Sequence, residues 1–240
     1  MEQTVFKQLK YNIRCEWGLS GLKALEKAAD IVIIVDILSF STCVDIAVSN
    51  DCKVFPFAYK NETSENFAKI NNAILAEKKR SLDKISLSPS SLSQLKKGER
   101  VILPSPNGST LSINCYAPII IAGCLRNAKA VADFANHNGK NILVIPAGEK
   151  WPDGSLRPSI EDWIGAGAII SYLNGSFSPE SYMAKEMFEL VKDNLITTLS
   201  DCSSGLELIE KGFIKDVELA SELNSSGNVP VLKNGFYSKS

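Results

Sequence analysis

The most constraining feature of this chain is an uninterrupted apolar run, Ile31 to Val35, that ends at an acidic residue. Five apolar residues in a row (IVIIV) are typical of a central parallel strand that is covered on both faces. Asp36 follows directly, where an unpaired carboxylate is costly to bury. Because α/β proteins bind ligands at the carboxyl edge of a parallel sheet, Asp36 is interpreted as a metal or substrate group or as a structural cap.

Strands that alternate with helices along the chain predict an α/β fold. We expect a three-layer α/β/α arrangement with a mostly parallel, mixed sheet whose antiparallel strands lie at its edges. Val229–Leu232 and Phe236–Tyr237 resemble a terminal hairpin. Glu62–Lys79 is predicted to form one long amphipathic helix. The 240 residues suit a single domain, residues 1–240, or two intertwined subdomains.

Composition narrows the function classes. A net charge of -1 gives no broad reason to expect a nucleic acid or an anionic membrane as partner. No apolar stretch approaches the roughly 20 residues of a membrane span, and the N-terminus is not that of a signal peptide. The six cysteines form no CxxC pair, which predicts reduced core residues and a cytoplasmic protein. The single histidine, His137, is expected at an exposed helix end. Oligomeric state stays open, with a homodimer possible.

The first of four strand-to-helix junctions follows the apolar run itself. A carboxylate such as Asp36 binds a hard cation such as Mg²⁺ directly. The hydroxyls of Ser39, Ser41 and Thr42 either donate to a phosphate or cap the helix expected from Ser41 to Val48. Spacing alone leaves both interpretations open.

The second junction is Ser105 to Thr110 (SPNGST), which follows an expected strand from Arg100 to Leu103. A glycine that lets an anion approach the backbone, followed by hydroxyls at a helix start, suits a phosphate cradle. The candidate residues are Asn107, Gly108, Ser109 and Thr110. An ordinary Asn-Gly turn is the alternative, although the pattern that follows is helical.

The third and fourth junctions add charged residues. The third is Cys124 to Asn127, where Arg126 either clamps an anion or lies in solvent and Asn127 is a good N-cap. The fourth junction, Gly148 to Gly167, holds Glu149, Asp153, Arg157, Glu161 and Asp162. Ser159 and Asp162 also fit a capping box. Acids, amides and arginines after successive strands favour a polyanionic substrate held with Mg²⁺.

Taken in order, these motifs resemble the 2-phosphosulfolactate phosphatases, the ComB family. Val35–Thr42 (VDILSFST) resembles the family's VDVLRAST strand, and Ser105–Thr110 resembles its TTNGT motif. Leu125–Ala128 is similar to its asparagine-containing helix start, and Glu161–Ala168 (EDWIGAGA) to its EDxxxAGA helix. The pattern from Ser203 to Asp216 is similar to its SxGxxLxxxGFxxD.

The resemblance implies a three-layer fold and Mg²⁺-dependent removal of phosphate from (R)-2-phospho-3-sulfolactate, which gives (R)-3-sulfolactate, or from a similar small phosphorylated acid. On this hypothesis Asp36 and Glu161 are catalytic, and Asp36, Glu161 and Asp162 hold the metal. The expected substrate-binding residues are Ser39, Ser41, Thr42, Asn107, Gly108, Ser109, Thr110, Arg126, Asn127 and Arg157.

Two positions depart from the family pattern. Ser39 stands where relatives carry an arginine, and Leu87–Ser90 is an eroded form of the family's GNSP segment. Arg126 or Arg157 is a candidate replacement for the lost charge. The loss at Ser39 favours a second hypothesis, a non-catalytic anion-binding or regulatory member of the same fold. A third is an interaction protein whose carboxylates are all caps.

Overall fold

The computed structural model describes residues 4–59, 62–77, 79–81 and 83–240, apart from the side chains of Thr4 and Glu62. Within them, nine strands form one sheet in the order β1-β7-β2-β6-β10-β11-β3-β5-β4, and β8 pairs with β9 in a separate ribbon. The strands are β1 Ile13–Cys15, β2 Ile31–Val35, β3 Lys53–Phe57, β4 Ile74–Leu75, β5 Arg100–Pro104, β6 Ile119–Gly123, β7 Ile142–Pro146, β8 Glu149–Lys150, β9 Leu156–Arg157, β10 Pro230–Lys233 and β11 Phe236–Lys239.

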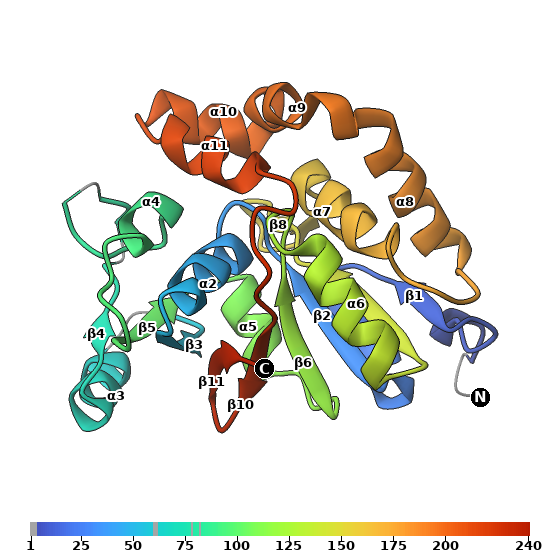
Figure 1. Cartoon of the computed structure of the whole chain (residues 1–240), viewed down its shortest axis with the longest axis horizontal. Coiled ribbons are helices and arrows are strands. Elements are labelled where there is room, and N and C mark those ends of the chain that lie inside the picture. Colours follow the sequence, from blue (N-terminus) through green and yellow to red (C-terminus); the bar gives the residue numbers. More distant parts are fainter. Residues whose placement is uncertain (1–3, 60–61, 78, 82) are drawn as a thin grey trace.

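Helices lie on both faces of the large sheet (Figure 1). The α-helices are α1 Gly18–Leu25, α2 Phe40–Ser49, α3 Glu62–Asn71, α4 Pro89–Leu92, α5 Gly108–Ile113, α6 Ala128–Asn138, α7 Ile160–Ile170, α8 Pro179–Val191, α9 Leu195–Asp201, α10 Ser203–Glu210 and α11 Ile214–Ser221. Short 3₁₀ helices cover Thr4–Lys7, Glu26–Ala28 and Lys192–Asn194.

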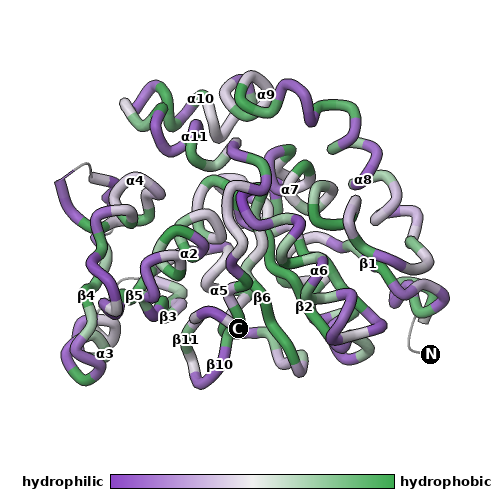
Figure 2. Tube along the Cα trace, in the orientation of Figure 1, coloured by the Kyte–Doolittle hydropathy of each residue, from purple (hydrophilic) through white to green (hydrophobic). Residues whose placement is uncertain are grey.

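The predicted central strand is β2, and all five of its residues are buried. Its side chains alternate between two cores. Ile33 packs in the cluster that holds α6 and α7, whereas Ile34 packs in the cluster that holds α1 and α5. Figure 2 shows the apolar colouring of β2 and β6 in the middle of the molecule. The α/β class and the three layers predicted from the sequence are therefore confirmed.

The prediction that antiparallel strands lie at the sheet edges is wrong. The C-terminal hairpin β10–β11 forms as predicted, but it is inserted between β6 and β3 in the middle of the sheet and pairs antiparallel with both. Its turn places Asn234 and Gly235 at positive φ, as an Asn-Gly hairpin turn requires. The hairpin thus joins a parallel block β1-β7-β2-β6 to a second parallel block β3-β5-β4.

The predicted long helix Glu62–Lys79 is also wrong in its second half. Helix α3 ends at Asn71, because Asn72 takes a positive φ and the amide of Ala73 turns back to the carbonyl of Ala68. Ile74 and Leu75 then pair with β5 as an edge strand. Lys78, which the prediction included, lies outside the described residues.

The cysteine and histidine predictions are confirmed. All six cysteines are buried and free, and His137 is exposed in the last turn of α6. Among the helices that the structure describes, none is long and apolar enough to cross a membrane.

Candidate active site

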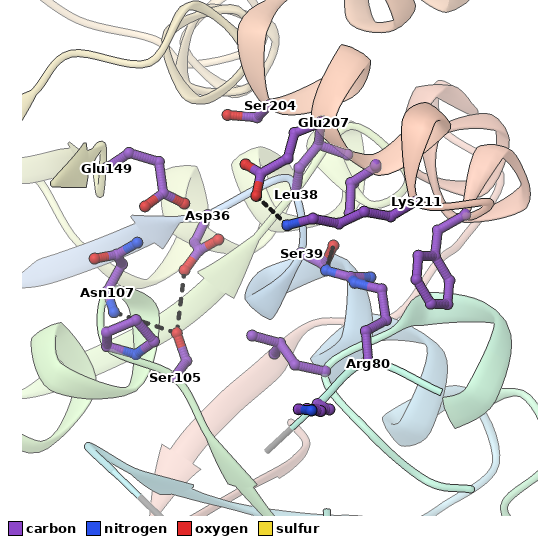
Figure 3. Close-up of a pocket in the computed structure, with 15 residues that line it drawn as sticks. Asp36, Leu38, Ser39, Arg80, Ser105, Asn107, Glu149, Ser204, Glu207 and Lys211 are labelled. Atoms are coloured by element: carbon purple, nitrogen blue, oxygen red, sulfur yellow. Dashed lines mark hydrogen bonds and ion pairs between the residues drawn. The ribbon is translucent and has the colours of Figure 1, made fainter. Parts of the chain in front are cut away.

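A cavity of about 610 Å³ opens beside the end of β2. Three groups of segments line it: the loops after β2, β5 and β7, the connection between β4 and α4, and helix α10 with the turn after it (Figure 3). Its ionisable lining residues within the described part of the chain are Asp36, Lys79, Arg80, Glu149, Glu207 and Lys211. Glu149 lies beside Asp36, whereas Arg80 and Lys211 lie on the other side, with Glu207 beside Lys211.

Asp36 is 6% exposed and is fixed by backbone amides. Its Oδ1 accepts a 3.2 Å hydrogen bond from the amide of Phe40, at the start of α2, and its Oδ2 accepts a 2.8 Å bond from the amide of Gly108, at the start of α5. The hydroxyl of Ser105 lies 3.5 Å from the same Oδ2. The carboxylate is thus held in one orientation at the wall of the cavity.

Glu149, Glu161 and Asp162 lie close to Asp36. Burial, followed by repulsion from Glu149 and Glu161, raises the pKa of Asp36 to about 7. Burial and the charge of Glu161 also raise the pKa of Glu149, although a hydrogen bond from the Asn107 side chain opposes this. Glu161 is buried beside the thiol of Cys202 and does not line the cavity. A dense patch of carboxylates favours an added cation or a bound proton.

Asp162 holds two of the loops together. Its Oδ1 accepts from the amide of Ile37 at 2.7 Å and its Oδ2 from the amide of Gly148 at 2.8 Å. Burial raises its pKa well above the usual value, and Asp36 and Glu161 add to this. The capping box predicted with Ser159 is not formed, because the Asp162 carboxylate bonds these distant amides and Ser159 makes no side-chain cap.

The predicted phosphate cradle is mostly occupied by internal bonds. The amide of Gly108 donates to Asp36, and the hydroxyl of Ser109 donates to the carbonyl of Leu103 at 2.8 Å. Thr110 Oγ1 is buried without a hydrogen-bond partner among the described residues. Asn107 lines the cavity and bonds Glu149. Gly108 is needed for a close approach, since a Cβ there would lie 2.2 Å from a ring carbon of Phe40.

The hydroxyls after β2 have separate roles. Ser41 bonds the backbone of Asp36, and Thr42 donates to the carbonyl of Ile37 at 2.8 Å, so both close the turn into α2. Ser39 lines the cavity and accepts a 3.1 Å hydrogen bond from Arg80. The structure thus brings Asp36, Ser39 and Asn107 to one cavity.

The two predicted arginines and Asn127 lie elsewhere. Arg126 forms ion pairs with Asp45 and Glu222, away from the cavity lining. Asn127 is fully buried and fixes the turn after β6 through the amide of Cys124.

The other predicted arginine, Arg157, stays at the margin of the site. Its backbone lies opposite that of Glu149 in the antiparallel β8–β9 ribbon. Its Nη2 donates a hydrogen bond to the hydroxyl of Ser204 at 3.2 Å. It is not among the described residues that line the cavity, although Glu149 and Ser204 are.

Sequence reasoning did not place Glu149 in the set of site residues, nor Lys79, Arg80 and Lys211. Glu149 carries a usable signal, because it follows the buried strand β7 as Asp36 follows β2. The three cations come from a polar loop and from a helix end, where the local pattern only indicates solvent-facing residues.

Comparisons with known proteins show the family of this chain. A family model described as 2-phosphosulpholactate phosphatase matches residues 20–235. A probable 2-phosphosulfolactate phosphatase of Carboxydothermus hydrogenoformans is 33% identical over 207 residues, which are 83% of this chain and 84% of the relative. The 2-phosphosulfolactate phosphatase of Methanocaldococcus jannaschii is 29% identical over 86% of this chain and 91% of its own length. The chain therefore belongs to the 2-phosphosulfolactate phosphatase family.

Proposed function

We propose that this protein is a Mg²⁺-dependent phosphatase that hydrolyses (R)-2-phospho-3-sulfolactate, or a similar small phosphorylated acid, to the free hydroxy acid and phosphate. The observation that carries the proposal is that one cavity holds acids and cations apart: Asp36 and Glu149 lie on one side, and Arg80 and Lys211, the latter paired with Glu207, lie on the other. Such a cavity suits a phosphate ester with a second anionic group when a bound cation neutralises the charge of the acids. The names of the relatives support the same substrate.

The chemistry of the acidic side fits Mg²⁺. Asp36 and Glu149 offer hard oxygen donors, and burial together with neighbouring acids raises the pKa of both, so a bound cation would favour their ionised forms. Among the described residues, no three His, Cys, Asp or Glu side chains form a ready-made metal cage. Mg²⁺ is usually held by one or two carboxylates together with substrate phosphate oxygens and waters, a role that the proposal gives to Asp36 and Glu149.

Asp36 and Glu149 would hold the ion. Glu161 does not line the cavity and would act on them through its negative charge. When bound, Mg²⁺ would neutralise phosphate charge and activate water for attack. The chain itself orients these acids: the Gly108 and Phe40 amides fix Asp36, and the Asn107 side chain bonds Glu149. Asp162 is proposed as a positioning residue, since both of its oxygens already accept backbone amides.

The test is phosphate release from phosphosulfolactate with Mg²⁺ and with EDTA. We expect release with Mg²⁺, loss of release in EDTA, and a fall of at least about a hundredfold in kcat for Asp36→Asn and Glu149→Gln. Asp133→Asn, an exchange at a half-exposed acid of α6, is the matched control. Full activity in EDTA would reject the metal. Binding of sulfolactate without turnover of any phosphoester would support a non-catalytic, anion-binding member of the fold.

A further inference from the structure

Arg80 reaches the cavity from a part of the chain that has no motif. It lies in the connection between β4 and α4, and its side chain is 16% exposed. Its Nη2 donates a 3.1 Å hydrogen bond to the hydroxyl of Ser39, and its Nη1 forms a 2.5 Å ion pair with Asp216 of α11. Figure 3 shows its guanidinium beside Ser39, across the cavity from Asp36 and Asn107.

The carboxylate that holds Arg80 is itself rigidly fixed. Asp216 is fully buried. Its Oδ1 accepts from the hydroxyl of Ser88 at 2.9 Å, and from the amide and the hydroxyl of Ser90 at 2.9 and 2.6 Å. Its Oδ2 is then left for the guanidinium, which also lies 5.5 Å from the ring centroid of Phe213. Such a set of contacts positions a planar guanidinium more firmly than a surface arginine.

The guanidinium has capacity for a ligand. Arginine has five N–H donors, and the bonds to Ser39 and Asp216 use two of them. Lys79 and Lys211 line the same cavity, which adds positive charge near Arg80, although Lys211 is paired with Glu207. Arg126, by contrast, is committed to Asp45 and Glu222.

We propose that Arg80 binds the second anionic group of the substrate, a carboxylate or a sulfonate, opposite the phosphoryl group at Asp36, and that Asp216 positions it for this. The inference rests on the proposed function, which supplies the substrate class. Ser39 and Arg80 together then form one anion-binding wall, built by two segments that are 41 residues apart in sequence.

The test compares Arg80→Ala and Arg80→Gln with the wild type on two substrates. One is phosphosulfolactate, and the other is phenyl phosphate, whose leaving group has no anionic substituent. Loss of a charge-assisted contact should raise the KM for phosphosulfolactate about tenfold or more, with kcat within about threefold, and leave the KM for phenyl phosphate unchanged. Arg100→Ala, at an exposed arginine of β5, is the control and should match the wild type.

A binding measurement separates this inference from the proposed function. Titration calorimetry with sulfolactate should show an affinity about tenfold weaker in both Arg80 variants. Because Asp216 positions Arg80, the affinity should also be weaker in Asp216→Asn. If the wild type binds sulfolactate through Arg80 but releases no phosphate, the phosphatase proposal fails and this inference stands. If the wild type turns over phosphosulfolactate and both Arg80 variants keep its KM, this inference is overturned and the phosphatase proposal stands. Arg80→Gln, which keeps most of the side-chain volume, carries the test if Arg80→Ala unfolds.

Discussion

The carboxylate of Asp162 accepts a 2.7 Å hydrogen bond from the amide of Ile37, the residue directly after Asp36. Its second oxygen accepts from the amide of Gly148, directly before Glu149. One buried side chain at the start of α7 therefore fixes the two loops that carry Asp36 and Glu149. The positions of Asp36 and Glu149 therefore depend on this contact as well as on the strands that precede them.

Replacing Asp162 by alanine should damage both stability and activity. Two buried amides would lose their acceptor, at a cost of about 1–3 kcal/mol each in unfolding free energy. Activity should fall more than tenfold, because Asp36 and Glu149 would lose their fixed spacing. Asp162→Asn should lose less, since its carbonyl oxygen still accepts one amide. Urea unfolding and phosphate release measure the two effects, and Asp133→Ala is the control at a half-exposed acid. Wild-type stability in Asp162→Ala would show that the amides find other partners.

Gly108→Ala tests the close approach of α5 to Asp36. A Cβ at this position would lie 2.2 Å from Cδ1 of Phe40 and 2.8 Å from Oδ2 of Asp36. We expect a loss of about 1–3 kcal/mol in unfolding free energy, together with reduced activity, because Phe40 and the carboxylate must both shift. Gly227→Ala is a matched control, since a Cβ there meets nothing within 4 Å. A melting temperature and a kcat for Gly108→Ala equal to those of Gly227→Ala would contradict this account.

Much of the fold and the central acid could be predicted from the sequence. The run IVIIV has one plausible place in an α/β protein, and Asp36 follows it at a strand end; Asn234-Gly235 likewise predicts its hairpin from two residues. Such features are encoded locally, by periodicity and by turn chemistry. The place of that hairpin within the sheet was not predicted, because strand order depends on contacts between distant segments.

The basic side of the cavity could not be predicted for the same reason. Arg80 stands in a polar segment whose composition indicates only a solvated loop. Its orientation comes from Asp216, which is 136 residues further along the chain. The hydroxyls of Ser41 and Thr42 show the opposite case: their pattern suited both a phosphate and a helix start, and the structure gives them bonds to nearby carbonyls.

The raised pKa of Asp36 predicts a pH-dependent affinity for Mg²⁺. Burial and the neighbouring acids bring this pKa to about 7, so a proton and a cation compete for the carboxylate near neutral pH. The rise in melting temperature caused by Mg²⁺ should be larger at about pH 8 than at about pH 6. Asp36→Asn should abolish this pH-dependent rise, whereas Asp133→Asn should keep it. An equal rise at both pH values in the wild type would speak against Asp36 as a ligand.

Asp30 provides a pH effect on stability outside the cavity. Its Oδ2 accepts hydrogen bonds from the amides of Asn141 and Lys140 at 2.8 and 3.0 Å, and these bonds lower the pKa of Asp30 in the folded protein. A folded-state pKa below the unfolded value of about 3.9 means that the ionised group contributes stability above that value and loses it as the pH falls through the folded pKa. The stability advantage of the wild type over Asp30→Ala should therefore be constant from about pH 5 to 7 and shrink below about pH 4. Urea unfolding across this range measures it, with Asp193→Ala as the exposed control; an advantage that grows towards acid pH would refute the assignment.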